Sequence, residues 1–324
     1  MNTSSVRVLV SGASPDNHNR NTVLRSYVAE GFSQVLGSSL VRSCALERAA
    51  EVAEVFGPQL VLCFGSCMPD DANYSSLRRW CDSNGACLVF WLHDDPYEFD
   101  YSYKLKDIAD IVFSNDRWCT AHYDHPWARH LPLAASKAAH WRDCGQPKDI
   151  SVFFCGVAFD NRKRLLKDLS STLEKHEALI LGDGWPADLA FCENRRLDNR
   201  ELSDHYARAL LTLNMGRDFH YANERFKLEP STPGPRTFEA AMAGTAQLFF
   251  VESLEILDYY EPVTEILLYN SAREFAQLVD GLLAAPEECT SIARAAQRRT
   301  LAEHTYRQRA EVILAEVARW RQGA

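Results

Sequence analysis

Three residues of the segment TPGPRTFEAAMAGTAQLFF, residues 232–250, combine charge and hydrogen-bonding capacity at a spacing that suits a nucleotide. Arg236 and Thr237 stand at the predicted start of a helix, where backbone N–H groups and a guanidinium together favour a phosphate. Glu239 lies in the first turn, and its carboxylate can accept hydrogen bonds from the vicinal hydroxyls of a ribose or hexose. The segment therefore predicts a nucleotide-sugar site. The structural alternative is a helix-capping Glu239 and a surface Arg236.

A second anion site is indicated in FFCGVAFDNRKRLL, residues 153–166. Here a strand ends at Gly156 and a helix follows that carries Arg162 in its first turn. Because consecutive helix residues point in different directions, only one residue of this basic run is expected to face inward, and a solvated basic face is the alternative. The segment LILGDGWP, residues 179–186, adds a turn in which Gly182 lets the backbone approach a ligand closely.

In the first half of the chain, His93, Asp94 and Asp95 follow a strand directly, before Pro96 turns the chain away. An imidazole and two carboxylates at such a point can recognise or deprotonate the hydroxyl of an acceptor. Neighbouring carboxylates are also a partial ligand set for a divalent ion, but no third ligand at helical spacing accompanies them. The sequence therefore predicts catalytic residues here and no metal. Capping of the next helix by one of the two aspartates is the structural alternative.

Apolar runs of strand length alternate with helical patterns through both halves of the chain, which is typical of parallel sheets covered by helices on both faces. The predicted strands of the first half are 6–12, 60–66, 87–92 and 110–115. Those of the second half are 151–156, 178–184, 210–216, 246–252 and 265–270. Because such sheets bind ligands beyond the carboxyl ends of their strands, the candidate residues stand where a site is expected.

Two α/β domains in tandem are therefore predicted, in line with a length of 324 residues. The periodicity breaks at 135–148, which indicates an N-terminal domain of residues 1–140 and a C-terminal domain of residues 141–324. One or two helices end the chain from about 287 to 322, with a junction near His304. The final helix is expected to pack back on the first domain, and a cleft between the domains is the expected ligand site.

Composition excludes several classes of partner. The chain has 35 Lys and Arg against 44 Asp and Glu, a net charge of −9, so no global footprint for nucleic acid is present. Its longest apolar runs, such as 246–251, fall far short of the roughly 20 residues that span a bilayer, so no membrane segment is expected. The ten cysteines form no CxxC pair, which indicates thiols in a reducing compartment. With no leader pattern at the start of the sequence, we expect a cytoplasmic protein.

Taken in order, these segments resemble the CgeB-like glycosyltransferases, a branch of the two-domain GT-B enzymes related to glycosyltransferase family 4. The similarity covers about 85–320, and its most specific parts are PRTFEAAMAG at 235–244 and HTYRQR at 304–309. It implies an α/β architecture of two Rossmann-like domains, with a nucleotide-diphosphate sugar held mainly by the second domain and an acceptor by the first. It also implies that the enzyme uses no bound metal and no cofactor, since the nucleotide sugar is a co-substrate.

Carried onto this chain, the resemblance implies that Glu239 binds the donor's ribose while Arg236 and Thr237 flank its diphosphate. Arg162 is implied as the cation at the leaving phosphate. Asn214 and Gly216 are implied to line the donor pocket, and Phe238, Gly156 and Gly182 are further candidate donor-binding residues. A long loop at 217–232 is expected to fold over the donor. Family 4 relatives often have a second glutamate eight residues before the helix glutamate, where this chain has Ser231, so the donor sugar and the anomeric outcome stay open.

The expected function is therefore the metal-independent transfer of a sugar from a nucleotide-diphosphate donor to a hydroxyl acceptor. The acceptor is a saccharide, a protein or a small molecule, and the sequence does not choose among them or indicate an oligomeric state. Two alternatives are a nucleotide-sugar epimerase of the GT-B class, which needs no separate acceptor, and a non-catalytic module that only binds the nucleotide sugar.

Overall fold

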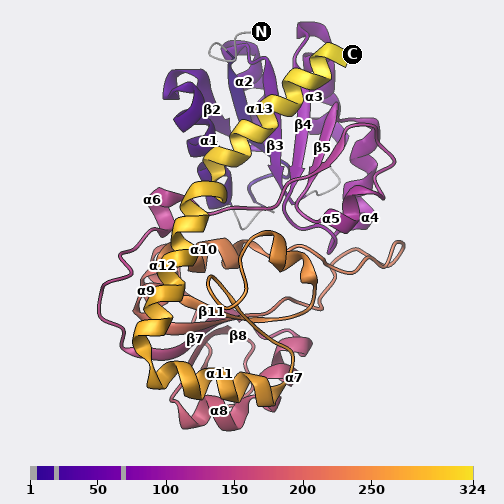
Figure 1. Cartoon of the computed structure of the whole chain (residues 1–324). Coiled ribbons are helices and arrows are strands. Elements are labelled where there is room, and N and C mark those ends of the chain that lie inside the picture. Colours follow the sequence, from indigo (N-terminus) through magenta and orange to yellow (C-terminus); the bar gives the residue numbers. More distant parts are fainter. Residues whose placement is uncertain (1–5, 18–21, 67–70, 324) are drawn as a thin grey trace. The chain divides into compact units, whose positions relative to one another are not determined.

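The computed structural model describes residues 6–17, 22–66 and 71–323, and it divides the chain into two compact units (Figure 1). Unit 1 consists of residues 1–133, 220–232 and 306–324, and unit 2 consists of residues 134–219 and 233–305. Each unit is built around one six-stranded sheet. The predicted pair of α/β sheets is thus confirmed, and the polypeptide passes from one unit to the other four times.

The sheet of unit 1 is parallel throughout and has the strand order β2-β1-β3-β4-β5-β6. Its strands are β1 Val8–Gly12, β2 Val41–Cys44, β3 Leu60–Gly65, β4 Cys87–Leu92, β5 Ile111–Ser114 and β6 Ala128–His130. Every residue of the inner strands β3 and β4 is buried, because both faces of a parallel sheet are covered. This explains why the inner strands appear in the sequence as unbroken apolar runs.

The helices of unit 1 come from both ends of the sequence. They are α1 Thr22–Leu36, α2 Ala49–Phe56, α3 Asp71–Asn84, α4 Phe99–Ser102, α5 Arg117–Thr120 and α13 Tyr306–Gly323, with the 3₁₀ helices η2 Ser38–Leu40, η3 Leu46–Arg48 and η4 Tyr103–Asp107. Helix α13 packs against α1, where a Cβ at Gly31 would clash with the backbone of Tyr306. The missing side chain of Gly31 therefore allows the two helices to approach closely.

The sheet of unit 2 is also parallel, with the strand order β12-β11-β10-β7-β8-β9. Its strands are β7 Ile150–Val157, β8 Leu179–Asp183, β9 Cys192–Glu193, β10 Ala209–Asn214, β11 Ala246–Phe250 and β12 Leu267–Tyr269. The strand order reverses between β7 and β10. From β7 the chain builds one half of the sheet through β8 and β9, and from β10 it builds the other half through β11 and β12. In sheets of this kind, that reversal marks the crevice where ligands bind.

Several helices of unit 2 begin at a capping side chain or at a proline. The helices of this unit are α6 Lys137–His140, α7 Asp160–Asp168, α8 Ser170–Lys175, α9 Asn199–Arg208, α10 Pro235–Ala243, α11 Ala272–Ala284, α12 Pro286–Glu303 and the 3₁₀ helix η5 Leu254–Asp258. Helix α10 begins at Pro235 and ends at Gly244, whose φ of 79° is left-handed, as the sequence predicts. Among the helices that the structure describes, none is long and apolar enough to cross a membrane.

Three short strands, β2, β6 and β9, were not predicted from the sequence, and all three stand at the edges of their sheets. Strand β2 has two exposed polar residues, and β9 has only two residues. Edge strands are covered on fewer sides than inner ones, so they lack the apolar runs by which the inner strands were recognised.

Residues 220–232 belong to unit 1, although the sequence predicts that this loop folds over a donor bound by the second half of the chain. The buried carboxylate of Asp116 holds its far end. Oδ2 of Asp116 accepts hydrogen bonds from the backbone N–H groups of Ser231 at 2.6 Å and Thr232 at 3.0 Å. Oδ1 of the same carboxylate caps helix α5. The segment is therefore fastened to the carboxyl edge of the first sheet.

Candidate functional site

Arg162 lies at the point where the strand order of unit 2 reverses. Its guanidinium donates hydrogen bonds to the carbonyl of Val157 at the end of β7, at 3.1 Å, and to the carbonyls of Met215 and Gly216 beyond β10, at 3.2 and 2.7 Å. It also lies over the rings of Phe154 and Phe159. The predicted cation thus lies where the strand order reverses, and its hydrogen bonds to backbone carbonyls tie the two halves of the sheet together.

Arg236 and Glu239 stand one turn apart at the start of α10 and form an ion pair. The side chain of Glu239 is 3% exposed, whereas that of Arg236 is 46% exposed. Burial acts to raise the pKa of Glu239, but the ion pair with Arg236 opposes it, and the pKa lies below its usual range. The carboxylate is therefore ionised and enclosed, and the guanidinium is the member of the pair that reaches the surface.

His140 is the third member of this cluster, and the sequence analysis missed it. Its Nδ1 accepts a hydrogen bond from the backbone N–H of Ser136 at 3.0 Å, so the ring proton is on Nε2. Nε2 lies 3.9 Å from Oε1 of Glu239, and the imidazole is 2% exposed. No local pattern could have identified this residue, because it lies in the segment interpreted as a domain boundary.

A buried polar network fixes the first turn of α10 to the last residue of β10 and to the second residue of β11. The side-chain amide of Asn214 donates to Thr237 Oγ1 at 2.6 Å and to Gln247 Oε1 at 3.0 Å. Gln247 in turn donates to the backbone carbonyl of Thr237 at 2.9 Å. Thr237 is fully buried. Asn214 and Thr237 thus hold the helix start in place, beneath the surface on which a ligand could lie.

Gly216 is paired with a carboxylate that the sequence analysis did not single out. The backbone N–H of Gly216 donates to Oε2 of Glu252 at 2.8 Å, and a Cβ at residue 216 would overlap that carboxylate. Glu252 follows strand β11, and Arg162 is one of the charges that act on it. A glycine is therefore required here to admit Glu252, and a signal for this long-range pair is absent from the local sequence.

Gly156 and Gly182 lie opposite each other on β7 and β8. Gly182 has a φ of 147°, and a Cβ there would clash with the carbonyl oxygen of Gly156. From the sequence, the missing side chain of Gly182 is expected to allow the close approach of a ligand. In the structure, the backbone that approaches is that of the neighbouring strand.

Phe238 points into the core of unit 2, although it is one of the candidate donor-binding residues predicted from the sequence. It is fully buried and packs edge-on against the ring of Tyr259 at 5.5 Å between centroids. Helix α10 thus divides its first turn between two faces, with Phe238 in the core and Arg236 at the surface.

In unit 1, the structure places His93 and Asp94 together at the carboxyl ends of β3 and β4. Nδ1 of His93 lies 3.3 Å from Oδ2 of Asp94, and the same oxygen accepts a hydrogen bond from Ser66 at 2.7 Å. The imidazole is 3% exposed and the Asp94 side chain is 26% exposed. Asp94 is therefore the accessible member of the pair, with His93 behind it.

Asp95 lies inside unit 1, away from any surface on which an acceptor could bind. Its Oδ2 accepts hydrogen bonds from Ser114 and Tyr123, both at 2.7 Å, and the residue is 1% exposed. Burial raises the pKa of this carboxyl to about 6, against the opposing effect of these hydrogen bonds. The geometry gives Asp95 a structural role. Among the described residues, no three His, Cys, Asp or Glu side chains are grouped as metal ligands would be.

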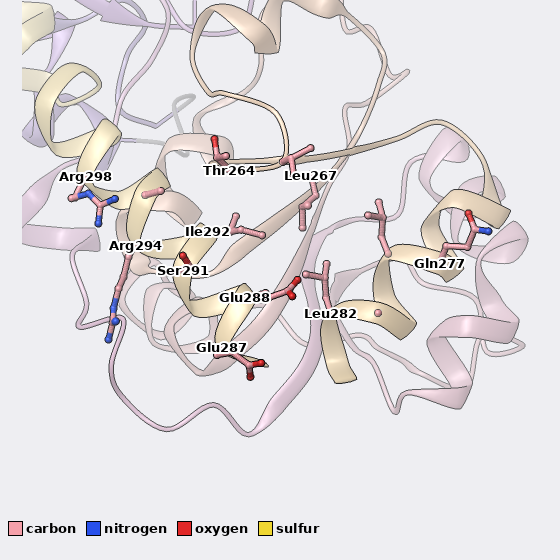
Figure 2. A pocket seen from close by; sticks show the side chains of 14 residues that line it. Thr264, Leu267, Gln277, Leu282, Glu287, Glu288, Ser291, Ile292, Arg294 and Arg298 are labelled. Carbon is pink, nitrogen blue, oxygen red and sulfur yellow. The ribbon is translucent and has the colours of Figure 1, made fainter. Parts of the chain in front are cut away.

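Two hollows of the surface lie apart from these clusters. One, of about 940 Å³, is lined by residues of α11 and α12 and of the loop before β12, among them Thr264, Leu282 and Arg298 (Figure 2). The other, of about 670 Å³, is lined by the end of α13 and includes Trp320. None of the predicted donor-binding or catalytic residues lines either hollow.

Solved structures show the same fold over the whole chain. HepE from Anabaena, in complex with UDP and glucose, is 11% identical with a TM-score of 0.60, covering 97% of this chain and 99% of that one. Sucrose-phosphate synthase from Thermosynechococcus elongatus is 11% identical with a TM-score of 0.62, covering 98% and 99%. A glycosyltransferase from Rickettsia africae is 10% identical with a TM-score of 0.63, covering 98% and 100%. The fold is GT-B, as the resemblance implies.

Residues 162–315 match the family described as "Glycosyl transferase-like". The search among curated proteins gave no match. The family match thus covers the second half of the chain, and the solved structures show that the whole chain has the GT-B fold. The matched residues include Arg162 and the whole of helix α10.

Proposed function

We propose that the protein transfers a sugar from a nucleoside-diphosphate donor, bound at the carboxyl edge of unit 2, to a hydroxyl of an acceptor bound by unit 1. The observation that carries this proposal is the pair at the start of α10, in which buried Glu239 anchors the half-exposed guanidinium of Arg236. A fixed cation beside the first turn of a helix is a binding site suited to a diphosphate.

The chemistry of transfer explains why such a cation is useful. Breaking the bond between sugar and phosphate develops negative charge on the departing diphosphate and positive charge on the anomeric carbon. A cation already in place stabilises that charge without reorganising. Arg236 supplies it directly. Arg162, through its hydrogen bonds to the carbonyls of Val157 and Gly216, holds the carboxyl ends of β7 and β10 together.

Glu239 then acts first as the anchor of Arg236. The resemblance implies that this carboxylate binds the donor's ribose, and it can do so only if its ion pair with Arg236 opens, because the side chain is 3% exposed. We propose that the diphosphate draws the guanidinium outward and so uncovers Glu239 for the ribose hydroxyls. His140 would remain beside the carboxylate as its second partner.

On the acceptor side, we propose that Asp94 hydrogen-bonds the hydroxyl that receives the sugar. Its side chain is the most exposed of the three residues that follow β4, and His93 lies 3.3 Å behind it. A carboxylate in this position can orient the hydroxyl and draw its proton as the new bond forms. Asp95 takes no part, since its carboxyl is enclosed by Ser114 and Tyr123.

UDP is the first donor nucleotide to test, because HepE, which shares the fold, was solved with UDP and glucose. Binding to the folded chain alone raises its melting temperature. We expect UDP to raise the melting temperature of the wild type and to have no such effect on Arg236→Ala. The matched control is Arg208→Ala, which removes an exposed arginine of unit 2 that pairs with Asp149. An equal shift in all three proteins would overturn the donor site.

Transfer itself is measured separately from binding. With UDP-glucose as donor, mass analysis should detect release of UDP by the wild type, faster with an acceptor than without one. Asp94→Asn should keep the UDP-induced shift and lose most of the acceptor-dependent rate. Formation of an isomerised nucleotide sugar without any acceptor would contradict the transferase proposal and favour an epimerase.

A further inference from the structure

The segment 220–232 does more than connect two stretches of unit 2, because it is built into unit 1 by its backbone. The N–H groups of Tyr221 and Ala222 both donate to the carbonyl of Tyr97 at 2.8 Å. The N–H of Asp100 donates to the carbonyl of Ala222, also at 2.8 Å. These bonds fix the start of the segment against the loop that follows His93 and Asp94.

Side chains hold the rest of the segment as firmly. Oδ2 of Asp100 accepts hydrogen bonds from the backbone N–H groups of Glu224 and Arg225 at 2.8 and 3.1 Å. The ring of Phe226 packs against those of Phe99 and Tyr103, both at 4.9 Å between centroids. Backbone and side-chain contacts therefore tie the segment to unit 1 at several points along its length.

The segment places aromatic side chains at the surface of unit 1. Tyr221 is 61% exposed, and its ring lies 6.2 Å from that of half-buried Tyr101 on α4. His220 lies 5.3 Å from the ring of Tyr97. We call Tyr97, Tyr101, His220 and Tyr221 the aromatic platform. Large aromatic side chains at a surface offer apolar area with little conformational entropy to lose, which suits them to binding.

The platform adjoins the proposed acceptor residue. The backbone N–H of Tyr97 donates to the carbonyl of Asp94 at 2.8 Å, so one turn carries both the carboxylate and the first ring of the platform. The nearby guanidinium of Arg225 already lies over Tyr103 and Phe226. The platform itself contributes the rings and hydroxyls of its tyrosines and the imidazole of His220, and the carboxylate of Asp94 belongs to the neighbouring turn.

This combination matches a saccharide. One face of a pyranose ring presents C–H groups, which the negative face of an aromatic ring attracts, while the hydroxyls at its rim seek hydrogen-bond partners. We infer that the aromatic platform binds a saccharide, and that the acceptor of the proposed transfer is therefore a sugar chain. This inference rests on the proposed function, and it selects one of the three acceptor classes that the sequence leaves open.

The test separates the platform from the donor site. Labelled full-length protein is applied to a glycan array in the presence of UDP, and the strongest glycan is then titrated by NMR against the wild type, Tyr221→Ala and Tyr221→Phe. We expect Tyr221→Ala to bind the glycan about tenfold more weakly, the loss of one aromatic contact. Tyr221→Phe keeps the ring and should bind within about twofold of the wild type.

Both variants should keep the full UDP-induced rise in melting temperature, because Tyr221 lies in unit 1. If UDP stabilises the wild type but no glycan binds, or if Tyr221→Ala binds the glycan as tightly as the wild type, the saccharide platform is wrong while the donor proposal stands. If UDP fails to stabilise the wild type but glycans bind through Tyr221, the donor proposal is wrong and the platform stands.

Discussion

Glu239 and Arg236 lie one turn apart on α10, and the pair is asymmetric: the carboxylate is enclosed at 3% exposure, and the guanidinium is 46% exposed. An enclosed carboxylate needs its partner far more than a surface one does, since removal of one member of a buried pair leaves an uncompensated charge. The same guanidinium is the cation that we propose for the donor diphosphate. Stability and donor binding therefore depend on one side chain.

Replacement of Arg236 should consequently destabilise the protein even without a ligand. We expect Arg236→Ala to lower the free energy of unfolding by about 2–3 kcal/mol. Arg208→Ala, which breaks the exposed pair with Asp149, should cost less than about 1 kcal/mol. Denaturant titrations at pH 7 measure both. Equal losses in the two variants would show that Glu239 is not enclosed.

Substitution of Gly182 should be far more costly than substitution of Gly184, two residues away. A Cβ at residue 182 would clash with the carbonyl of Gly156 on β7, at a φ of 147° that alanine rarely adopts. Gly184 has a φ of 79°, and the nearest atom to its added Cβ is 3.8 Å away. We expect losses of about 3 kcal/mol for Gly182→Ala and about 1 kcal/mol for Gly184→Ala. Thermal melts compare them, and similar melting temperatures would contradict the close strand contact.

Gly216 and Glu252 should show strong energetic coupling. Gly216→Ala places a methyl group where the carboxylate lies, so the 2.8 Å hydrogen bond breaks at a cost of about 1 kcal/mol. Glu252→Ala removes the same bond and also makes room for the methyl group. The double variant should therefore be no less stable than Glu252→Ala alone, as a double-mutant cycle measures. Additive losses would mean that the two residues act independently.

Asp95 makes stability depend on pH. Its folded pKa of about 6 lies above the ordinary value of 3.8, so the folded state binds the proton more tightly than the unfolded state does. The resulting stabilisation is complete below about pH 4 and is lost as the pH rises through about 6. Relative to Asp95→Asn, the free energy of unfolding of the wild type should fall across this interval and then level off. A constant difference from pH 4 to pH 7 would refute the raised pKa.

Local signals predicted much of the fold. Strand β4 was predicted at 87–92 and is Cys87–Leu92, because an unbroken apolar run bounded by polar residues has few other ways to fold. Helix α10 begins at Pro235 and ends before Gly244, because proline favours the first helical position and glycine favours the left-handed position after the last turn. The junction expected near His304 separates α12 from α13.

The remaining features depend on partners distant in sequence. Ser231 bonds to Asp116, 115 residues earlier, and only that contact shows that the segment 220–232 belongs to unit 1. Glu252 accepts a hydrogen bond from Gly216, 36 residues earlier, and His140 lies beside Glu239 from the other side of a predicted domain boundary. The spacing of residues along the chain does not indicate such long-range contacts. Residue types thus indicated a phosphate and hydroxyl chemistry, but not which groups are enclosed.

Unit 1 is discontinuous in sequence, and this limits which fragments and hybrids of the protein can fold. A fragment that stops at residue 133 would leave Gly31 without the helix that lies on it and Asp116 without Ser231 and Thr232. Transfer of unit 1 to a related protein would require all three of its segments, residues 1–133, 220–232 and 306–324. Hybrids made by a single crossover are therefore expected to lack part of unit 1.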